Sequence, residues 1–196
     1  ISDNVDLSEV KWRGNGYDVA ELSRIYTQND FRTGLILKKM QEYIGNSRLH
    51  KVRALCFCVD KEHAKFMNAK FTLAGLKTEM LTSDDDKHHR DLVKEQLKKG
   101  AINYLFVVDL FNEGVDIPEI VNLVFYKKIR SKIKFWQMIG RGTRLAPNLI
   151  CTDETGSYVG KNYFYIFDYL RNFEFFREQK NGIEGSSAKA LSERIF

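Results

Sequence analysis

Five runs of strand length, most of them continuously apolar, alternate with helix-length segments along the middle of the chain. This alternation constrains the fold more than any other feature, because strands buried on both faces and interleaved with helices are typical of a mostly parallel sheet. The sequence therefore predicts an α/β fold, an open sheet with helices on both faces. The runs are VRALCFCV (52–59), TEMLT (78–82), NYLFVV (103–108), VNLVFY (121–126) and NYFYIFD (162–168).

The segments that follow the first two runs carry helix start and stop signals. Asp60 is in position to cap a helix that ends near Gly75. After the second run, Ser83 is expected to cap a helix that begins with acidic residues and ends with lysines before Gly100, which suits the helix dipole. Strand and helix thus alternate at least twice in succession.

Three regions differ in character. Residues 1–50 are predicted to form an N-terminal helical and linker segment with two amphipathic helices, and residues 51–179 form the main α/β domain. Residues 180–196 hold few large apolar side chains, so we expect a poorly ordered tail. Because the chain begins at Ile1 rather than Met, we expect it to be part of a longer protein.

Bulk properties exclude several classes of protein. The formal net charge of +5 and the pI near 9.0 favour polyanionic partners, although a protein with no such partner could carry the same charge. The three cysteines have no CxxC spacing, so neither a zinc site nor a disulfide framework is expected and no metal site is predicted. No apolar run is long enough to cross a membrane, and we expect a cytoplasmic protein.

Polar residues just after the strands are the candidate functional residues, because open parallel sheets bind ligands beyond the carboxyl ends of their strands. Four places qualify: Asp60 with Lys61, Thr82 with Ser83, the segment Asp109–Asp116, and QMIGRGTR (137–144). In the third, Gly114 allows a tight turn and Pro118 stiffens its exit. The Asp116 carboxylate could accept hydrogen bonds from sugar hydroxyls, but taken alone it is better explained as a local cap.

QMIGRGTR places two arginines three positions apart, with Gly140 and Gly142 keeping the backbone open. The planar guanidinium groups of Arg141 and Arg144 match phosphate oxygens two at a time, so the pair suits a transferring phosphoryl group. An arginine finger contributes roughly 10³ to 10⁵ in rate to such reactions. The alternative is a pair of solvated arginines on a helix, which is the usual role of isolated arginines.

The order of these motifs resembles a known family. GVDIP, then a strand, then QMIGRGTR is similar to motifs V and VI of the superfamily 2 helicases and translocases, and RALCFCVDKEHAKFMNAKF resembles their motif IV. The resemblance covers roughly residues 50–170 and implies a RecA-like second motor domain. It is closest to the motor subunits of type I and type III restriction enzymes and their helicase-like relatives.

The resemblance implies a role for each matching position. Arg141 and Arg144 match the arginines that reach the γ-phosphate of ATP, and further nucleotide contacts fall on Gly114, Asp116, Gln137 and Gly140. Contacts with nucleic acid fall on Asp60, Lys61, Thr82, Ser83, Lys87, Arg90 and Asp109. The sequence departs from the family at Val108, where a threonine is common, and at Met138, where many members have an arginine.

The chain has neither a Walker A loop nor a DExx carboxylate pair. The resemblance implies that these belong to a first RecA-like domain of the same chain, which would hold ATP and Mg²⁺, and that this fragment alone is inactive. The expected function is that of an ATP-dependent DNA helicase or translocase, with nuclease or methylation and specificity subunits as further partners. The alternative is a stand-alone nucleic-acid-binding or regulatory module with no ATP role.

Overall fold

The computed structural model describes residues 10–13, 16–27, 29–45, 51–108, 110, 117–153 and 156–178. Its centre is a five-stranded sheet in which every neighbouring pair of strands is parallel. The strand order is β4 (Thr78–Leu81), β5 (Tyr104–Val107), β3 (Ala54–Phe57), β6 (Asn122–Phe125) and β9 (Tyr165–Asp168). The predicted α/β fold is confirmed, and each of the five runs contains one of these strands.

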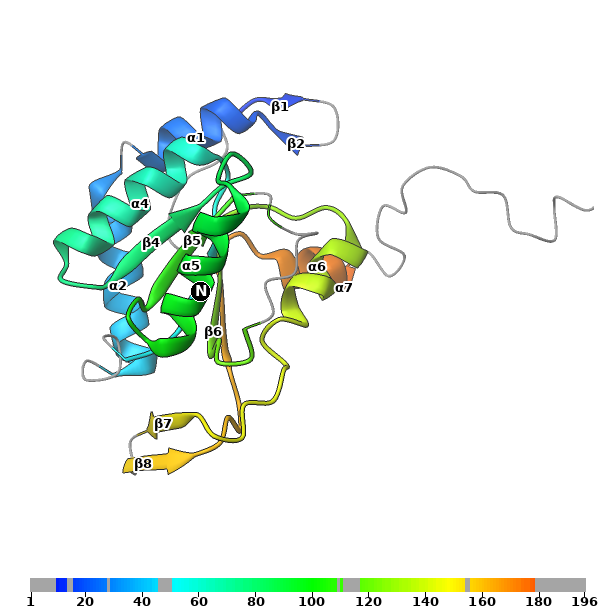
Figure 1. Cartoon of the computed structure of the whole chain (residues 1–196). Coiled ribbons are helices and arrows are strands. Elements are labelled where there is room, and N and C mark those ends of the chain that lie inside the picture. The colour runs from blue at the N-terminus through cyan, green and yellow to red at the C-terminus, as the bar shows by residue number, and fades with distance from the viewer. Residues whose placement is uncertain are drawn as a thin grey trace, which may run out of the picture.

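Helices cover both faces of the sheet (Figure 1). The side chain of Cys56 points to one face with α2 (Asp30–Ile44) and α4 (Lys61–Leu73). Its neighbours Leu55 and Phe57 pack on the other face. That second face is covered by α5 (Lys87–Lys99), α6 (Lys132–Ile139) and α7 (Asn172–Glu178). The three central strands, β5, β3 and β6, are buried on both faces, as is typical of a parallel sheet covered by helices.

The amino-terminal part of the described chain packs beside α4. A short hairpin of β1 (Trp12–Arg13) and β2 (Gly16–Tyr17) precedes α1 (Val19–Thr27). Leu22 and Tyr26 of α1 are buried with Val59 and Leu170, which follow β3 and β9. Helix α1 therefore lies near the carboxyl ends of the strands, where the sequence places its candidate functional residues. No helix among the described residues is long and apolar enough to span a bilayer.

The cap predicted at Asp60 is confirmed, whereas the cap predicted at Ser83 is wrong. The Asp60 side chain accepts a hydrogen bond from the backbone N–H of His63. The cap of α5 is Asp86, which accepts from the N–H of His89 at 2.8 Å. A turn stabilised by Thr82 occupies the residues between β4 and this cap, so the helix starts later. Gly100 ends α5 with a φ of 73°, as predicted.

A second hairpin, β7 (Ile150–Asp153) with β8 (Gly156–Val159), was not predicted. It lies away from the main sheet, beyond the amino ends of its strands (Figure 1). Both Ile150 and Val159 are exposed, so neither strand shows the long apolar run of a buried strand.

Candidate nucleotide and nucleic-acid site

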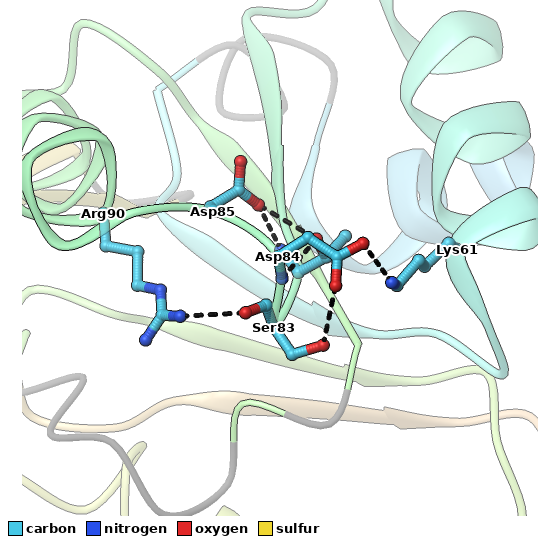
Figure 2. Close-up of polar contacts among 6 residues, drawn as sticks. Lys61, Ser83, Asp84, Asp85 and Arg90 are labelled. Carbon is cyan, nitrogen blue, oxygen red and sulfur yellow. Dashed lines mark hydrogen bonds and ion pairs between the residues drawn. The ribbon is translucent and has the colours of Figure 1, made fainter.

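The turn after β4 is built around Thr82. Its backbone N–H and its hydroxyl both donate to Oδ2 of Asp85, at 2.7 and 3.1 Å, and its Oγ1 accepts from the N–H of Asp84 at 3.2 Å (Figure 2). Thr82 is buried, so its polar groups are used inside the turn. The side chain predicted to contact nucleic acid therefore fixes the backbone that presents Ser83 and Asp84 to solvent.

Lys61 of α4 forms an ion pair with Asp84 across two neighbouring loops (Figure 2). The hydrogen bond from Lys61 lowers the pKa of the Asp84 carboxyl below its usual value, and Ser83 donates a second, longer bond of 3.4 Å to it. Both partners are well exposed, with 49% of the Lys61 side chain and 71% of the Asp84 side chain accessible. Exposed pairs are held weakly, so a phosphate could replace Asp84 as the partner of Lys61.

Arg90 reaches the same turn from α5. Its Nη2 donates to the backbone carbonyl of Ser83 at 3.1 Å (Figure 2). His89 lies near the turn as well, with its Nε2 3.7 Å from Oδ1 of Asp85. Lys87 stands exposed in the first turn of α5. The structure thus brings Lys61, Ser83 and Arg90 together around Asp84, a residue that sequence reasoning did not single out.

Asp60 has a structural position between two helices. Its Oδ1 accepts from the N–H of His63 and from the hydroxyl of Ser23 in α1, both at 2.8 Å. One carboxylate oxygen therefore caps α4 and ties α1 to it. Sequence reasoning found the cap but missed Ser23, which lies 37 residues earlier and carries no local signal.

Asp60→Ala is expected to lower the free energy of unfolding by about 1 kcal/mol, because the helix loses its cap. Denaturant unfolding of the 196-residue chain would measure the change. Asp60→Asn is the matched control, since asparagine caps helices equally well. Equal destabilisation by both substitutions would contradict the capping role and point to the charge.

The motif QMIGRGTR begins in α6, and its two arginines lie in the tight turn that follows this helix. Its two arginines differ in surroundings, because Arg141 is half-buried and Arg144 is exposed. Burial lowers the pKa of Arg141 below its usual value. The Thr143 hydroxyl donates to the carbonyl of Gly140 at 3.0 Å and tightens the turn. The predicted nucleotide residue Gln137 is exposed in the last part of α6.

Gly142 is required by close packing rather than by an open backbone. A Cβ atom at this position would lie 2.5 Å from Cδ2 and Cε2 of Phe164 and 3.0 Å from Cδ1 of Leu123. Gly140 has an ordinary helical φ of −55°. The turn that carries the arginines therefore packs its backbone against side chains of the sheet, and sequence reasoning had no signal for Phe164.

The two departures from the family pattern are core positions here. Met138 and Val108 are only 1% and 5% exposed, on opposite faces of the sheet. An apolar side chain suits both. The remaining predicted site residues, Asp109, Gly114 and Asp116, lie outside the described residues.

Comparison with known proteins identifies the family. Residues 36–146 match the helicase conserved C-terminal domain. The chain is 32% identical over 146 residues to the IRC3 protein of Saccharomyces cerevisiae, and 31% identical over 169 residues to the type I restriction enzyme EcoKI endonuclease subunit of Escherichia coli. These alignments cover 71% and 77% of the chain. They cover only 20% and 14% of the two relatives, so the chain spans a small part of their length.

Solved structures share the fold. The C-terminal domain of the DEAD-box protein Dbp5 superimposes with a TM-score of 0.55 over 78% of this chain and 81% of that chain, at 16% identity. The E. coli DEAD-box protein SrmB gives 0.51 over 77% and 71%, at 18% identity. The chain therefore belongs to the helicase conserved C-terminal domain family, as a second RecA-like domain of superfamily 2 related to type I restriction enzyme subunits.

Proposed function

We propose that the chain is the second motor domain of an ATP-dependent DNA helicase or translocase of the restriction-enzyme type. It would work with a first RecA-like domain of the same protein, which holds ATP and Mg²⁺. The family match and the similarity to a type I restriction enzyme endonuclease subunit support this assignment. In such motors catalysis depends on positioned charge around the transferring phosphoryl group.

The observation that carries the proposal is the turn after α6. Its backbone is packed against the sheet at Gly142, while Arg144 is exposed on the same turn. We assign Arg141 and Arg144 to the γ-phosphate, with further nucleotide contacts from Gln137, Gly140, Gly114 and Asp116. Arg141 is already partly desolvated, so it loses less hydration when it meets a phosphate. ATP supplies the cleavable phosphoanhydride; this chain supplies the positive charge.

Nucleic acid would bind at the carboxyl ends of β3 and β4. Lys61, Lys87 and Arg90 provide positive charge there, and the turn of Ser83 and Asp84 contacts both Lys61 and Arg90. Such groups contact the phosphate backbone and read no sequence, so the affinity would depend steeply on salt. Asp60 and Thr82 belong to the same edge and would act by holding these loops in place. We assign Asp109 to the same contacts because it follows the third apolar run in the sequence.

Assaying ATP hydrolysis by the full-length protein with single-stranded DNA, duplex DNA and RNA tests this function. We expect stimulation by DNA and no turnover by the pure 196-residue chain. Stimulation by RNA alone would overturn the DNA assignment. Binding of nucleic acid without any ATP hydrolysis would favour a regulatory module instead.

Lys87→Ala is expected to weaken DNA binding and to lower the slope of log K against log salt by about 1, because one phosphate contact is lost. Titrations of the full-length protein at several salt concentrations would measure that slope. Lys65→Ala removes another exposed lysine, on α4, and is the matched control. An unchanged slope for Lys87→Ala, or the same loss in both variants, would remove Lys87 from the interface.

A further inference from the structure

A second concave site lies at the opposite edge of the sheet, where the strands begin. It is a cavity of about 220 Å³ between the amino ends of β3, β6 and β9, the end of α2 and the hairpin β7–β8. Its lining includes Ile44, Arg53, Asn122, Cys151, Tyr158 and Tyr163. The motifs of the motor lie elsewhere: Lys61 and Ser83 follow the strands, and Arg144 follows α6. The proposed function therefore gives this cavity no role.

Asn122 is the unusual group in this cavity. It is 0% exposed at the start of β6, and neither its Oδ1 nor its Nδ2 has a hydrogen-bond partner among the described residues. The register places Asn122 beside Ala54 and Tyr165, and Tyr165 lines the same cavity. A buried amide without partners is costly, and native proteins satisfy most such groups.

Asn103 provides the contrast within the same sheet. It is also buried and directly precedes β5, but its Nδ2 donates to the carbonyl of Val52 at 2.9 Å. The asparagine that does not face the cavity is therefore tied to the backbone. Asn122 lines the cavity and keeps a donor and an acceptor, neither of which has a partner among the described residues.

Aromatic rings form one wall of the cavity. The rings of Tyr158 and Tyr163 have centroids 6.5 Å apart, and those of Tyr163 and Tyr165 are 5.5 Å apart and nearly perpendicular. All three tyrosines line the cavity. Such rings offer flat apolar surfaces on which planar heterocycles stack. The volume is below the range of about 300–1,000 Å³ of drug-sized sites, so a single ring system fits best.

Positive charge lies beside this wall. Arg53 lines both this cavity and a neighbouring depression that also includes Lys98 and Glu119. The Nε of Arg53 donates to the carbonyl of Leu97 at 3.0 Å, which holds the guanidinium in place. Lys51 adds an exposed ammonium group. These cations outnumber the carboxylate of Glu119, so the surroundings suit an anionic substituent on the ligand.

We propose that this cavity binds a nucleobase whose edge presents a hydrogen-bond donor beside an acceptor, as adenine does, with an attached phosphate near Arg53 and Lys51. Asparagine pairs with adenine in this manner, through the N6 amino group and the N7 acceptor. The tyrosines stack on the ring. A free nucleotide and a base of a nucleic-acid strand share this chemistry, and both can be tested.

Titrating the 196-residue chain with AMP, with adenosine and with a short oligo(dA) tests the site. AMP is expected to bind more tightly than adenosine because of its phosphate. Asn122→Leu is expected to weaken AMP binding about tenfold or more, and Tyr163→Ala to do the same by removing a stacking surface. Oligo(dA) binding at this site would identify a strand as the source of the base; binding of AMP alone would identify a free nucleotide.

Two measurements separate this site from the motor. Arg144→Ala should leave AMP binding unchanged, whereas loss of binding in that variant would place AMP at the arginine motif and overturn the proposal. In ¹H–¹⁵N spectra the side-chain amide signal of Asn122, assigned by its disappearance in Asn122→Leu, should shift on addition of AMP. An unmoved signal, or equal affinity in the wild type and in Asn122→Leu, would also overturn it. This spectroscopic test stands even if Asn122→Leu folds poorly, because Asn122→Gln can supply the assignment.

Discussion

Arg144→Ala in the full-length protein is expected to lower DNA-stimulated ATP hydrolysis by about 10³-fold or more. The reason is geometric as well as electrostatic. Arg144 is exposed on a turn whose backbone is packed against the sheet, so its charge can meet a phosphate without a search through many loop conformations. Steady-state ATPase assays with saturating DNA would measure the loss.

Two further variants define the role of this arginine. Arg144→Lys keeps the charge but loses the planar fork, and we expect it to recover only a small part of the activity. Arg177→Ala removes an exposed arginine of α7 and should leave hydrolysis near the wild-type rate. DNA affinity without nucleotide should stay unchanged in Arg144→Ala. Hydrolysis near the wild-type rate in that variant would show that Arg144 is not an arginine finger.

The fold was predictable because each central strand has two buried faces. Leu55 and Cys56 point to opposite faces of the sheet, yet both are buried, so β3 appears in the sequence as an unbroken apolar run. The same holds for β5 and β6, whose residues are all buried. Phe176 of α7, near the end of the described chain, is buried against the sheet as well.

Features that depend on contacts between distant residues were not predictable. The hairpin β7–β8 has exposed residues at both ends, and no local pattern separates it from a loop. The predicted cap of α5 was Ser83, but the observed cap is Asp86, because Thr82 and Asp85 form a turn of their own before the helix. Ser83, Asp84, Asp85 and Asp86 can all cap a helix, and only the structure shows that Asp86 does so.

The candidate site also contains residues that the sequence predicted and a residue that it did not. Sequence motifs located Lys61, Ser83 and Arg90, but not Asp84, which lies among them as the partner of Lys61. No sequence motif marks Asp84, because its role depends on the position of Lys61, which is distant in the sequence. In the proposed interface a phosphate of the nucleic acid would have to compete with this carboxylate for Lys61.

Gly142 offers a test of how firmly the arginine turn must be held. Gly34→Ala is the control for the substitution itself, because a Cβ at Gly34 meets nothing within 4 Å. Alanine in the middle of α2 is more favourable than glycine by about 1 kcal/mol. We therefore expect Gly34→Ala to stabilise the chain slightly and to leave ATP hydrolysis unchanged.

Gly142→Ala is expected to lower the free energy of unfolding by about 1–3 kcal/mol, because the new methyl group cannot share space with the Phe164 ring. If the turn shifts instead of the ring, Arg141 and Arg144 move, and ATP hydrolysis falls more than stability does.

Adding Phe164→Ala frees the space that the methyl group needs. The double variant should then regain hydrolysis relative to Gly142→Ala. It stays less stable than the wild type because a large, partly buried ring that packs against the core has been removed. Thermal unfolding and ATPase assays on the four members of this cycle separate the two outcomes. Additive losses in the cycle would show that Gly142 and Phe164 do not interact, and the packing account of the motif would then be wrong.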